Sequence, residues 1–213
     1  MAEEVAPITI NLPSKYAPDK RTKTDPSGAP SASSPPLDWL ARTWSVTHST
    51  LSMWRDARNV RITYKVLEPK PTQAGASLAR IDDLVEYEPG SKSSVLKSVH
   101  GVDTQSGSGG WDWRGKGWLF FVGTHWELLG WGESALPESQ GGGVERWAVT
   151  WFAPTVFTKE GVDVYCDRRE GLSEATYARV RAALAGVEAE GLRAMVERDM
   201  RPVEIKLPWT ERK

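Results

Sequence analysis

Hydrophobic and polar residues alternate along the middle of the chain, from Leu37 to about residue 170. Within 59–68, for example, Val60, Ile62 and Tyr64 alternate with polar side chains. A period of two residues is typical of β-strands, whose successive side chains point to opposite faces. Eight or nine such segments follow one another, and turns rich in glycine, proline, serine and aspartate separate them. Because no helical pattern intervenes, neighbouring strands are expected to pair antiparallel, and so many strands favour closure into a barrel.

The period changes near the C-terminal end of the chain. Apolar residues recur at intervals of three or four from Tyr177 to Val187, and Ser173 precedes them as a candidate N-cap. This spacing predicts an α-helix within 171–200, with glycines that favour a break into two pieces. The predicted fold class is therefore all-β, a barrel of eight or nine antiparallel strands over 37–170 followed by a C-terminal helix.

Both ends of the chain differ from the barrel region in composition. Residues 1–36 are rich in proline, serine, alanine and lysine, which predicts a flexible N-terminal segment. Residues 201–213 are predicted to form an extended C-terminal arm. Each end contains a short alternating island bounded by prolines, at 7–13 and 202–208, which suits an edge strand or a docked arm. The two islands either pair with each other or dock separately, and such arms offer a route to a homodimer.

Charge and cysteine content limit the binding partners and the cellular compartment that we expect for this protein. The chain has 27 basic and 28 acidic residues, so its formal net charge is −1. This balance leaves no basic surface for nucleic acid or for an anionic membrane, and neither is an expected partner. The single cysteine, Cys166, rules out a disulfide within the chain, and the first residues lack the basic and apolar regions of a secretory signal. We therefore expect a cytoplasmic protein.

The opening of the predicted barrel resembles that of the lipocalins. In LDWLARTWSVTHS, residues 37–49, a short helical turn leads to Trp44 at the start of the first strand. Arg42 stands where the family usually has glycine, two positions before this tryptophan. Three stretches are similar to small lipocalin-like proteins of fungi, and they are 43–64, 111–132 and 152–165. The resemblance, which covers about residues 37–185, implies a calycin barrel with Trp44 as a plug at its closed end and a function in the range from carrier to cyclase.

Aromatic residues are concentrated in one stretch, 111–132, which holds five tryptophans and five glycines in 22 positions. Glycines allow strands to bend or to approach one another closely. The tryptophans either fill the barrel as core residues or form a flat wall that holds a planar or polyene ligand by stacking. On the second interpretation, the candidate ligand-binding residues are Tyr64, Tyr87, Trp113, Trp118 and Trp126.

His125 and Glu127 are the preferred candidates for catalysis. They lie two residues apart, so their side chains share one face of a strand. An imidazole beside a carboxylate can donate or accept a proton near neutral pH. Trp126 lies between them and points to the other face of a regular strand. The barrel interior therefore holds either Trp126 or the pair, unless a bulge intervenes.

His48 and Asp83 are further catalytic candidates, because each alternates with apolar residues. His48 shares a face with Trp44 and Val46, which predicts that it points into the barrel. Asp83 is predicted to be a buried acid, which is either catalytic or paired with an arginine. The candidate arginines are Arg61, Arg114 and Arg146.

Metal and cofactor motifs are absent from the sequence. The three histidines lie in three separate predicted strands, so no metal site is expected. Phosphate-loop and dinucleotide-binding glycine patterns are also missing, so no cofactor is expected. Two functions stay open. The barrel binds a small, largely hydrophobic molecule either as a cofactor-independent cyclase or isomerase of the pericyclase type, in natural-product biosynthesis, or as a non-catalytic carrier.

Overall fold

The computed structural model describes residues 7–17, 34–72, 75, 77–90, 95–106, 110–155 and 158–211. Its strands are β1 (Thr43–Ser49), β2 (Ala57–Pro71), β3 (Ser77–Pro89), β4 (Lys97–Gln105), β5 (Trp111–Gly115), β6 (Gly123–Ala135), β7 (Val144–Phe152), β8 (Gly161–Cys166) and β9 (Arg201–Pro202). Its α-helices are α1 (Leu37–Leu40), α2 (Glu174–Ala185) and α3 (Glu190–Asp199). Three single 3₁₀ turns are η2 (Ser52–Trp54), η3 (Gly117–Leu119) and η4 (Glu138–Gln140).

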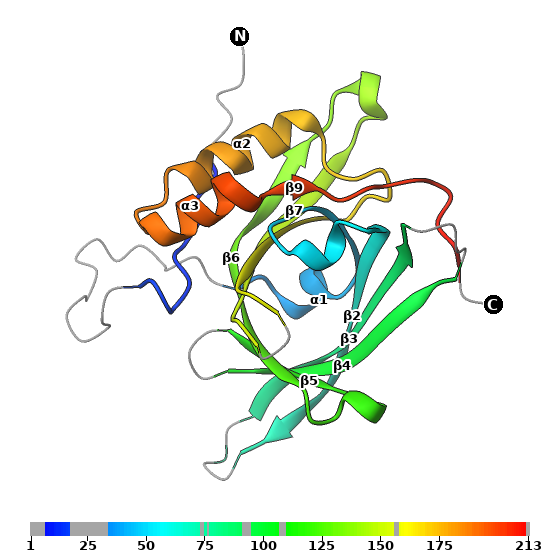
Figure 1. Ribbon diagram of the computed structural model, residues 1–213, viewed down its shortest axis with the longest axis vertical. Helices are drawn as coiled ribbons and strands as arrows, with labels where there is room; N and C mark the ends of the chain where they lie inside the picture. Colours follow the sequence, from blue (N-terminus) through cyan, green and yellow to red (C-terminus); the bar gives the residue numbers. More distant parts are fainter. Residues whose placement is uncertain are drawn as a thin grey trace.

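The eight strands β1 to β8 form a closed antiparallel barrel (Figure 1). Each strand pairs with the next along the chain, and β1 also pairs with β8, which closes the sheet. The short strand β9 pairs with the end of β1. This arrangement confirms the predicted all-β barrel with a C-terminal helix. The helical part consists of two helices, because the chain leaves the helical conformation between Gly186 and Ala189.

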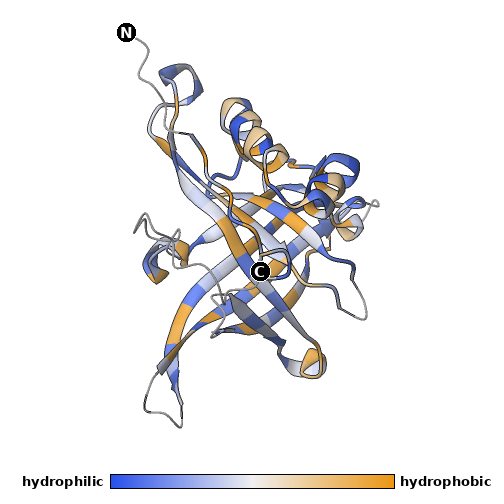
Figure 2. Cartoon of the chain, turned by 90° about the vertical axis from the view of Figure 1, so that its left-hand side faces the viewer, coloured by the Kyte–Doolittle hydropathy of each residue, from blue (hydrophilic) through white to orange (hydrophobic). Residues whose placement is uncertain are grey.

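Apolar residues form one core inside the barrel and a second core outside it. Alternating residues of the strands, such as Val46 and Ile62, fill the inner core. The outer core lies where α2 and α3 cover one side of the barrel, and there Val164 of β8 packs with Val180 and Leu192 of the helices (Figure 1). Hydrophobic and hydrophilic bands follow one another along the strands (Figure 2). All six residues of β8 are buried, because the helices cover its outer face and the barrel interior covers the other.

Trp44 occupies the position at the barrel end that the lipocalin resemblance implies. Its side chain is fully buried, and its indole N–H donates a hydrogen bond of 2.9 Å to the Leu40 carbonyl oxygen at the end of α1. The Trp39 ring lies 5.0 Å away between ring centroids. The short helix and the first strand are thereby joined by one aromatic cluster.

The described parts of the two arms dock on different strands of their own barrel. The Asn11 amide donates to the Leu129 carbonyl oxygen of β6 at 2.7 Å, so residues 7–17, which the sequence assigns to a flexible segment, lie against the barrel. The Val203 amide donates to Thr47 of β1 at 2.9 Å, beside β9. The alternative in which the two islands pair with each other is therefore wrong. Residues 1–6 and 18–33 lie outside the described residues, and dimerisation through the arms stays a prediction.

Candidate functional site

The barrel encloses a cavity of about 650 Å³ that reaches the protein surface. Most of its lining is apolar and comes from β2 to β7, η2 and the turn around η3. All five predicted ligand-binding residues line it, and they are Tyr64, Tyr87, Trp113, Trp118 and Trp126. Asp83 lines it as well, whereas His48, His125 and Glu127 are not among the lining residues.

Three stacked rings form a wall inside the barrel. Trp126 is almost completely buried, and its ring lies 5.9 Å from Tyr64 and 5.9 Å from Trp111 between centroids, with interplanar angles of 13° and 16°. The Trp126 indole N–H donates to Asp103 Oδ1 at 2.7 Å, which fixes the ring orientation. Sequence reasoning did not include Trp111 among the candidates, although it lies two residues before Trp113 and so shares its face.

A glycine makes room for the aromatic residue on the neighbouring strand. Gly101 of β4 lies beside β5, and a Cβ atom added there would come within 2.3 Å of the Trp113 ring. The ring therefore lies directly over the backbone of β4, where no other residue type fits. Gly101 thus lets the large Trp113 ring lie close against the strand β4, so that the ring takes up less of the barrel interior.

The entrance of the cavity carries exposed aromatic side chains. Trp118 in η3 is 79% exposed and Phe121 is 58% exposed, yet both line the cavity. Phe120 beside them is 68% exposed. Trp118 thus belongs to the rim of the cavity, whereas Trp126 belongs to its interior.

Two carboxyl groups meet beside the stacked rings. Asp83 of β3 is buried, and burial together with the neighbouring Asp103 carboxyl raises the pKa of Asp83 well above its usual range. Burial also raises the pKa of Asp103 to about 7, although the hydrogen bond from Trp126 favours its charged form. Two carboxyls this close cannot both ionise easily, so the pair retains one proton at neutral pH.

A third buried carboxyl, Asp163 of β8, lies in the cavity lining. Burial raises its pKa to about 7, while the Ser49 hydroxyl donates a hydrogen bond to Oδ1. Sequence reasoning missed Asp103 and Asp163. Asp103 follows Val99 and Gly101 on one face of its strand, which is a usable signal. Asp163 shares the inner face of β8 with Tyr165, and Val162 and Val164 face the helices. Both faces of β8 are covered and all its residues are buried, so the pattern does not show which face is inside.

The predicted ion pair between Asp83 and an arginine is wrong for the described residues. Arg61 binds Glu86 at 3.2 Å, and Arg146 binds Glu133 at 2.8 Å and Asp167 at 3.1 Å. The physical reason is the strand period. Arg61 and Arg114 alternate with the inward-facing Ile62 and Trp113, so they lie on the outer face of the barrel. Arg146 shares the face of Ala148 and Phe152, but it lies near the other end of β7 from the cavity-lining Phe152.

His125 and Glu127 form the predicted pair, but on the outer face of the barrel. His125 Nε2 lies 3.3 Å from Glu127 Oε1. The Ser14 amide of the N-terminal arm donates to Glu127 Oε2 at 2.9 Å, and the Ser14 hydroxyl donates to Oε1. Trp126 takes the inward position between them, and the irregularity in β6 comes only after Leu128. The expectation that this pair points into the cavity is therefore wrong.

His48 also lies outside the barrel, because a bulge in β1 reverses the alternation. The register with β8 shifts between Val46 and His48, so Val46 points inward and His48 points toward α2. The His48 ring stacks on Tyr177 with a centroid distance of 3.4 Å and an interplanar angle of 7°. Burial lowers its pKa to about 4. The prediction of an inward His48 is wrong for this reason.

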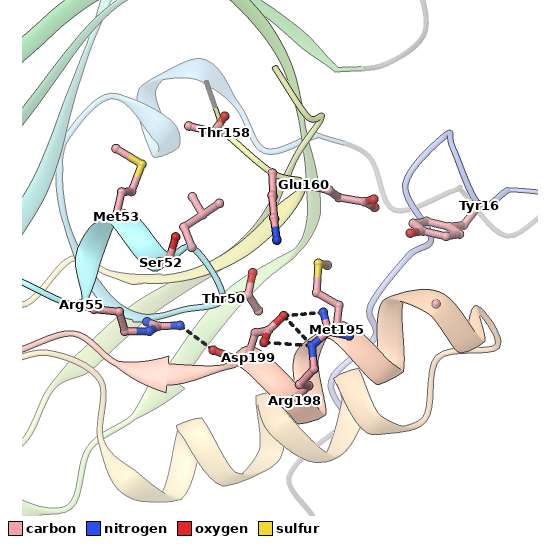
Figure 3. A pocket seen from close by; sticks show the side chains of 13 residues that line it. Tyr16, Thr50, Ser52, Met53, Arg55, Thr158, Glu160, Met195, Arg198 and Asp199 are labelled. Atoms are coloured by element: carbon pink, nitrogen blue, oxygen red, sulfur yellow. Dashed lines mark hydrogen bonds and ion pairs between the residues drawn. The ribbon is translucent and has the colours of Figure 1, made fainter. Parts of the chain in front are cut away.

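A second pocket, of about 690 Å³, lies outside the barrel between η2, residues 158–160 and α3 (Figure 3). Two of its arginines, Arg55 and Arg198, contact Asp199. The Arg55 guanidinium donates to the Asp199 carbonyl oxygen at 2.6 Å, and Arg198 forms an ion pair with the Asp199 carboxylate (Figure 3).

The described part of the chain contains no group of three or more histidine, cysteine, aspartate or glutamate side chains placed to hold a metal ion. None of its helices combines the length and the apolar character that crossing a membrane requires.

Comparisons with known proteins show the fold of this chain. No family model and no curated protein matches its sequence. Among solved structures, the fold is similar to that of lobster apocrustacyanin A1, with a TM-score of 0.50 and 9% sequence identity over 96% of this chain and 94% of that chain. At this identity the similarity concerns the fold alone. Together with the closed eight-stranded barrel, it shows a lipocalin-like fold.

Proposed function

We propose that the protein binds a small, largely hydrophobic molecule inside its barrel. The observation that carries this proposal is the open cavity of about 650 Å³ next to the stacked Tyr64 and Trp126 rings. Small-molecule sites are typically concave and apolar, with a volume of about 300–1,000 Å³ and a few polar groups that fix the orientation of the ligand. A planar ligand gains both buried area and ring stacking on such a wall.

The rim supports the same proposal. Trp118, Phe120 and Phe121 leave large apolar surfaces in contact with water at the entrance. Contiguous exposed apolar side chains are unfavourable unless they contact something, and they commonly mark a binding surface. A hydrophobic ligand that enters the barrel passes these side chains and removes part of their surface from water.

A cofactor-independent cyclase or isomerase is the second candidate, and one observation favours it. Asp83 lines the cavity, and burial together with Asp103 raises its pKa, so the proton that the Asp83–Asp103 pair retains could be donated to a bound substrate by Asp83 as a general acid. His48, His125 and Glu127 lie outside the cavity, so this candidate depends on Asp83 instead. The aromatic wall would hold the substrate in a reactive conformation.

A fluorescence titration tests the proposed binding. The neutral hydrophobic dye N-phenyl-1-naphthylamine is added to the wild-type protein, to Val99→Trp and to Val102→Trp. Val99 lines the cavity, whereas Val102 alternates onto the outer face of the same strand. We expect saturable binding in the wild type and in Val102→Trp, and at least about tenfold weaker binding in Val99→Trp because the new ring fills the cavity. Equal affinity in all three proteins would contradict the proposal.

Native mass spectrometry and product analysis separate the carrier from the enzyme. A copurifying molecule recovered unchanged from wild type and from Asp83→Asn supports the carrier. If a candidate substrate is converted, the enzyme hypothesis predicts that Asp83→Asn lowers turnover by about 10²–10⁴-fold and leaves binding of the dye unchanged.

A further inference from the structure

Two acidic side chains line the cavity, although most of its other lining residues are apolar. Asp83 and Asp163 line it from β3 and β8, and Asp83 is only 6% exposed. Lys97 is the one basic residue among the described lining residues, and it lies exposed at the start of β4. Asp83 Oδ1 is buried and accepts no hydrogen bond from an amide, a hydroxyl or a basic side chain of the described chain, and the neighbour of the Asp83 carboxyl is the Asp103 carboxyl.

The Asp83 and Asp103 carboxyls have no basic partner in the described structure, whereas the charge of Arg55 acts on Asp163. Asp103 lies behind Asp83, and its carboxylate accepts a hydrogen bond from the Trp126 indole. No lysine or arginine forms an ion pair with Asp83, Asp103 or Asp163 in the part of the chain that the structure describes. When Asp83 and Asp103 share one proton, the pair carries one negative charge. A buried negative charge favours a cation as its partner.

The acid and the aromatic wall lie side by side. Asp83 of β3 is the direct cross-strand neighbour of Tyr64 of β2, and Tyr64 stacks on Trp126. Side chains of directly opposite residues in an antiparallel pair are about 4.5–5.5 Å apart at Cβ. A ring stacked on this wall therefore brings a short substituent within reach of the Asp83 carboxyl.

We propose that the cavity selects ligands with a flat apolar body and one amine, whose ammonium group contacts Asp83. This inference rests on the proposed binding function and names its ligand class. Asp163 adds a second acidic group to the same cavity. A neutral alcohol of the same shape would hydrogen-bond without compensating the charge, and a carboxylate would be repelled.

Isothermal titration calorimetry with three matched indoles tests the preference. Tryptamine, tryptophol and indole-3-propionate share the same ring and the same two-carbon chain, and they end in an ammonium, a hydroxyl and a carboxylate group. We expect wild type to bind tryptamine at least about tenfold more tightly than tryptophol, because a charge-assisted hydrogen bond in a buried site provides a difference of this size. We expect indole-3-propionate to bind most weakly.

Two neighbouring variants locate the preference. Asp83→Asn keeps the shape of the side chain and should bind tryptamine and tryptophol equally. Asp82→Asn is the matched control, because Asp82 lies on the outer face of β3, where it contacts Lys116 and His100 Nε2. This control should retain the tenfold preference.

The outcomes separate the two levels of the hypothesis. If the neutral dye binds in the cavity but wild type does not prefer tryptamine to tryptophol, the amine inference is wrong and the binding function stands. A preference that survives in Asp83→Asn also overturns the inference. If neither the dye nor any indole binds, both proposals fail. The wild-type comparison decides the preference even if Asp83→Asn does not fold.

Discussion

Truncation of Trp44 gives the most direct measure of the energy that closes the barrel end. Trp44 is fully buried, so Trp44→Ala removes the contacts of the whole indole and leaves a cavity. A tryptophan buries about 200 Å², and at about 25 cal/mol per Å² this corresponds to about 5 kcal/mol as an upper value. Measured losses for large aromatic residues in cores are about 3–5 kcal/mol, and we expect a value in this range.

The hydrogen bond of the indole contributes little to this loss. Trp44 Nε1 donates to the Leu40 carbonyl oxygen, but the Arg42 amide also donates to that oxygen, at 2.9 Å. The acceptor therefore stays satisfied after the truncation, and only the net value of one hydrogen bond, about 1 kcal/mol, is lost. Trp44→Phe should consequently be much less destabilising than Trp44→Ala.

Urea unfolding followed by circular dichroism measures the free energy of unfolding of each variant. For a chain of this size, each kcal/mol lowers the melting temperature by about 2–4 °C, so Trp44→Ala should melt about 6–20 °C below wild type. Trp118→Ala is the control, because the same chemical change at a side chain that is 79% exposed should cost little. Equal unfolding of Trp44→Ala and wild type would refute the assignment of Trp44 as a structural plug.

Two predictions concern the pH dependence of stability. Burial lowers the pKa of His48 from about 6.5 to about 4, so the folded state resists protonation and stability is lost as pH falls through this range. His48→Phe retains a ring against Tyr177 and should lose less melting temperature than wild type between about pH 7 and about pH 5; an identical loss would contradict the burial of His48. Burial raises the pKa of Asp163 to about 7, so its contribution is present below the unfolded value near 3.8 and is lost as pH rises toward 7. Asp163→Asn keeps an acceptor for Ser49 and should show a smaller decline of the urea midpoint from about pH 5 to about pH 8. Unchanged slopes would show that Asp163 is ionised in the folded state.

The period of the sequence alone was enough to predict the barrel and several of its inward residues. Alternation is a local property, because a regular strand places every second side chain on the same face. Tyr64, Tyr87 and Asp83 lie on alternating faces and were predicted as candidates, Trp113 was predicted from the concentration of aromatic residues, and all four line the cavity. The helical spacing after Ser173 likewise predicted helices, since an apolar stripe at this spacing needs a surface to cover.

Only the tertiary structure decided which face of some strands is inside. In β6 the period predicts that Trp126 and Glu127 point to opposite faces, but either face suits a barrel interior. The choice depends on the neighbours. Trp126 stacks with rings from two other strands and binds Asp103, whereas Glu127 meets Ser14 from the distant N-terminal arm. Contacts between residues far apart in the chain leave no periodic signal.

A single inserted residue was the other limit of the sequence argument. The bulge in β1 turns His48 toward Tyr177 of α2, and no composition cue announces it. The inward face of β8 is also not predictable from the sequence, because the helices cover its outer face and all six of its residues are buried, Asp163 included. Periodicity thus determined that this chain forms a barrel with aromatic residues inside. The packing of helices, arms and neighbouring strands decided which acids reach the cavity, because burial of a face depends on what lies against it.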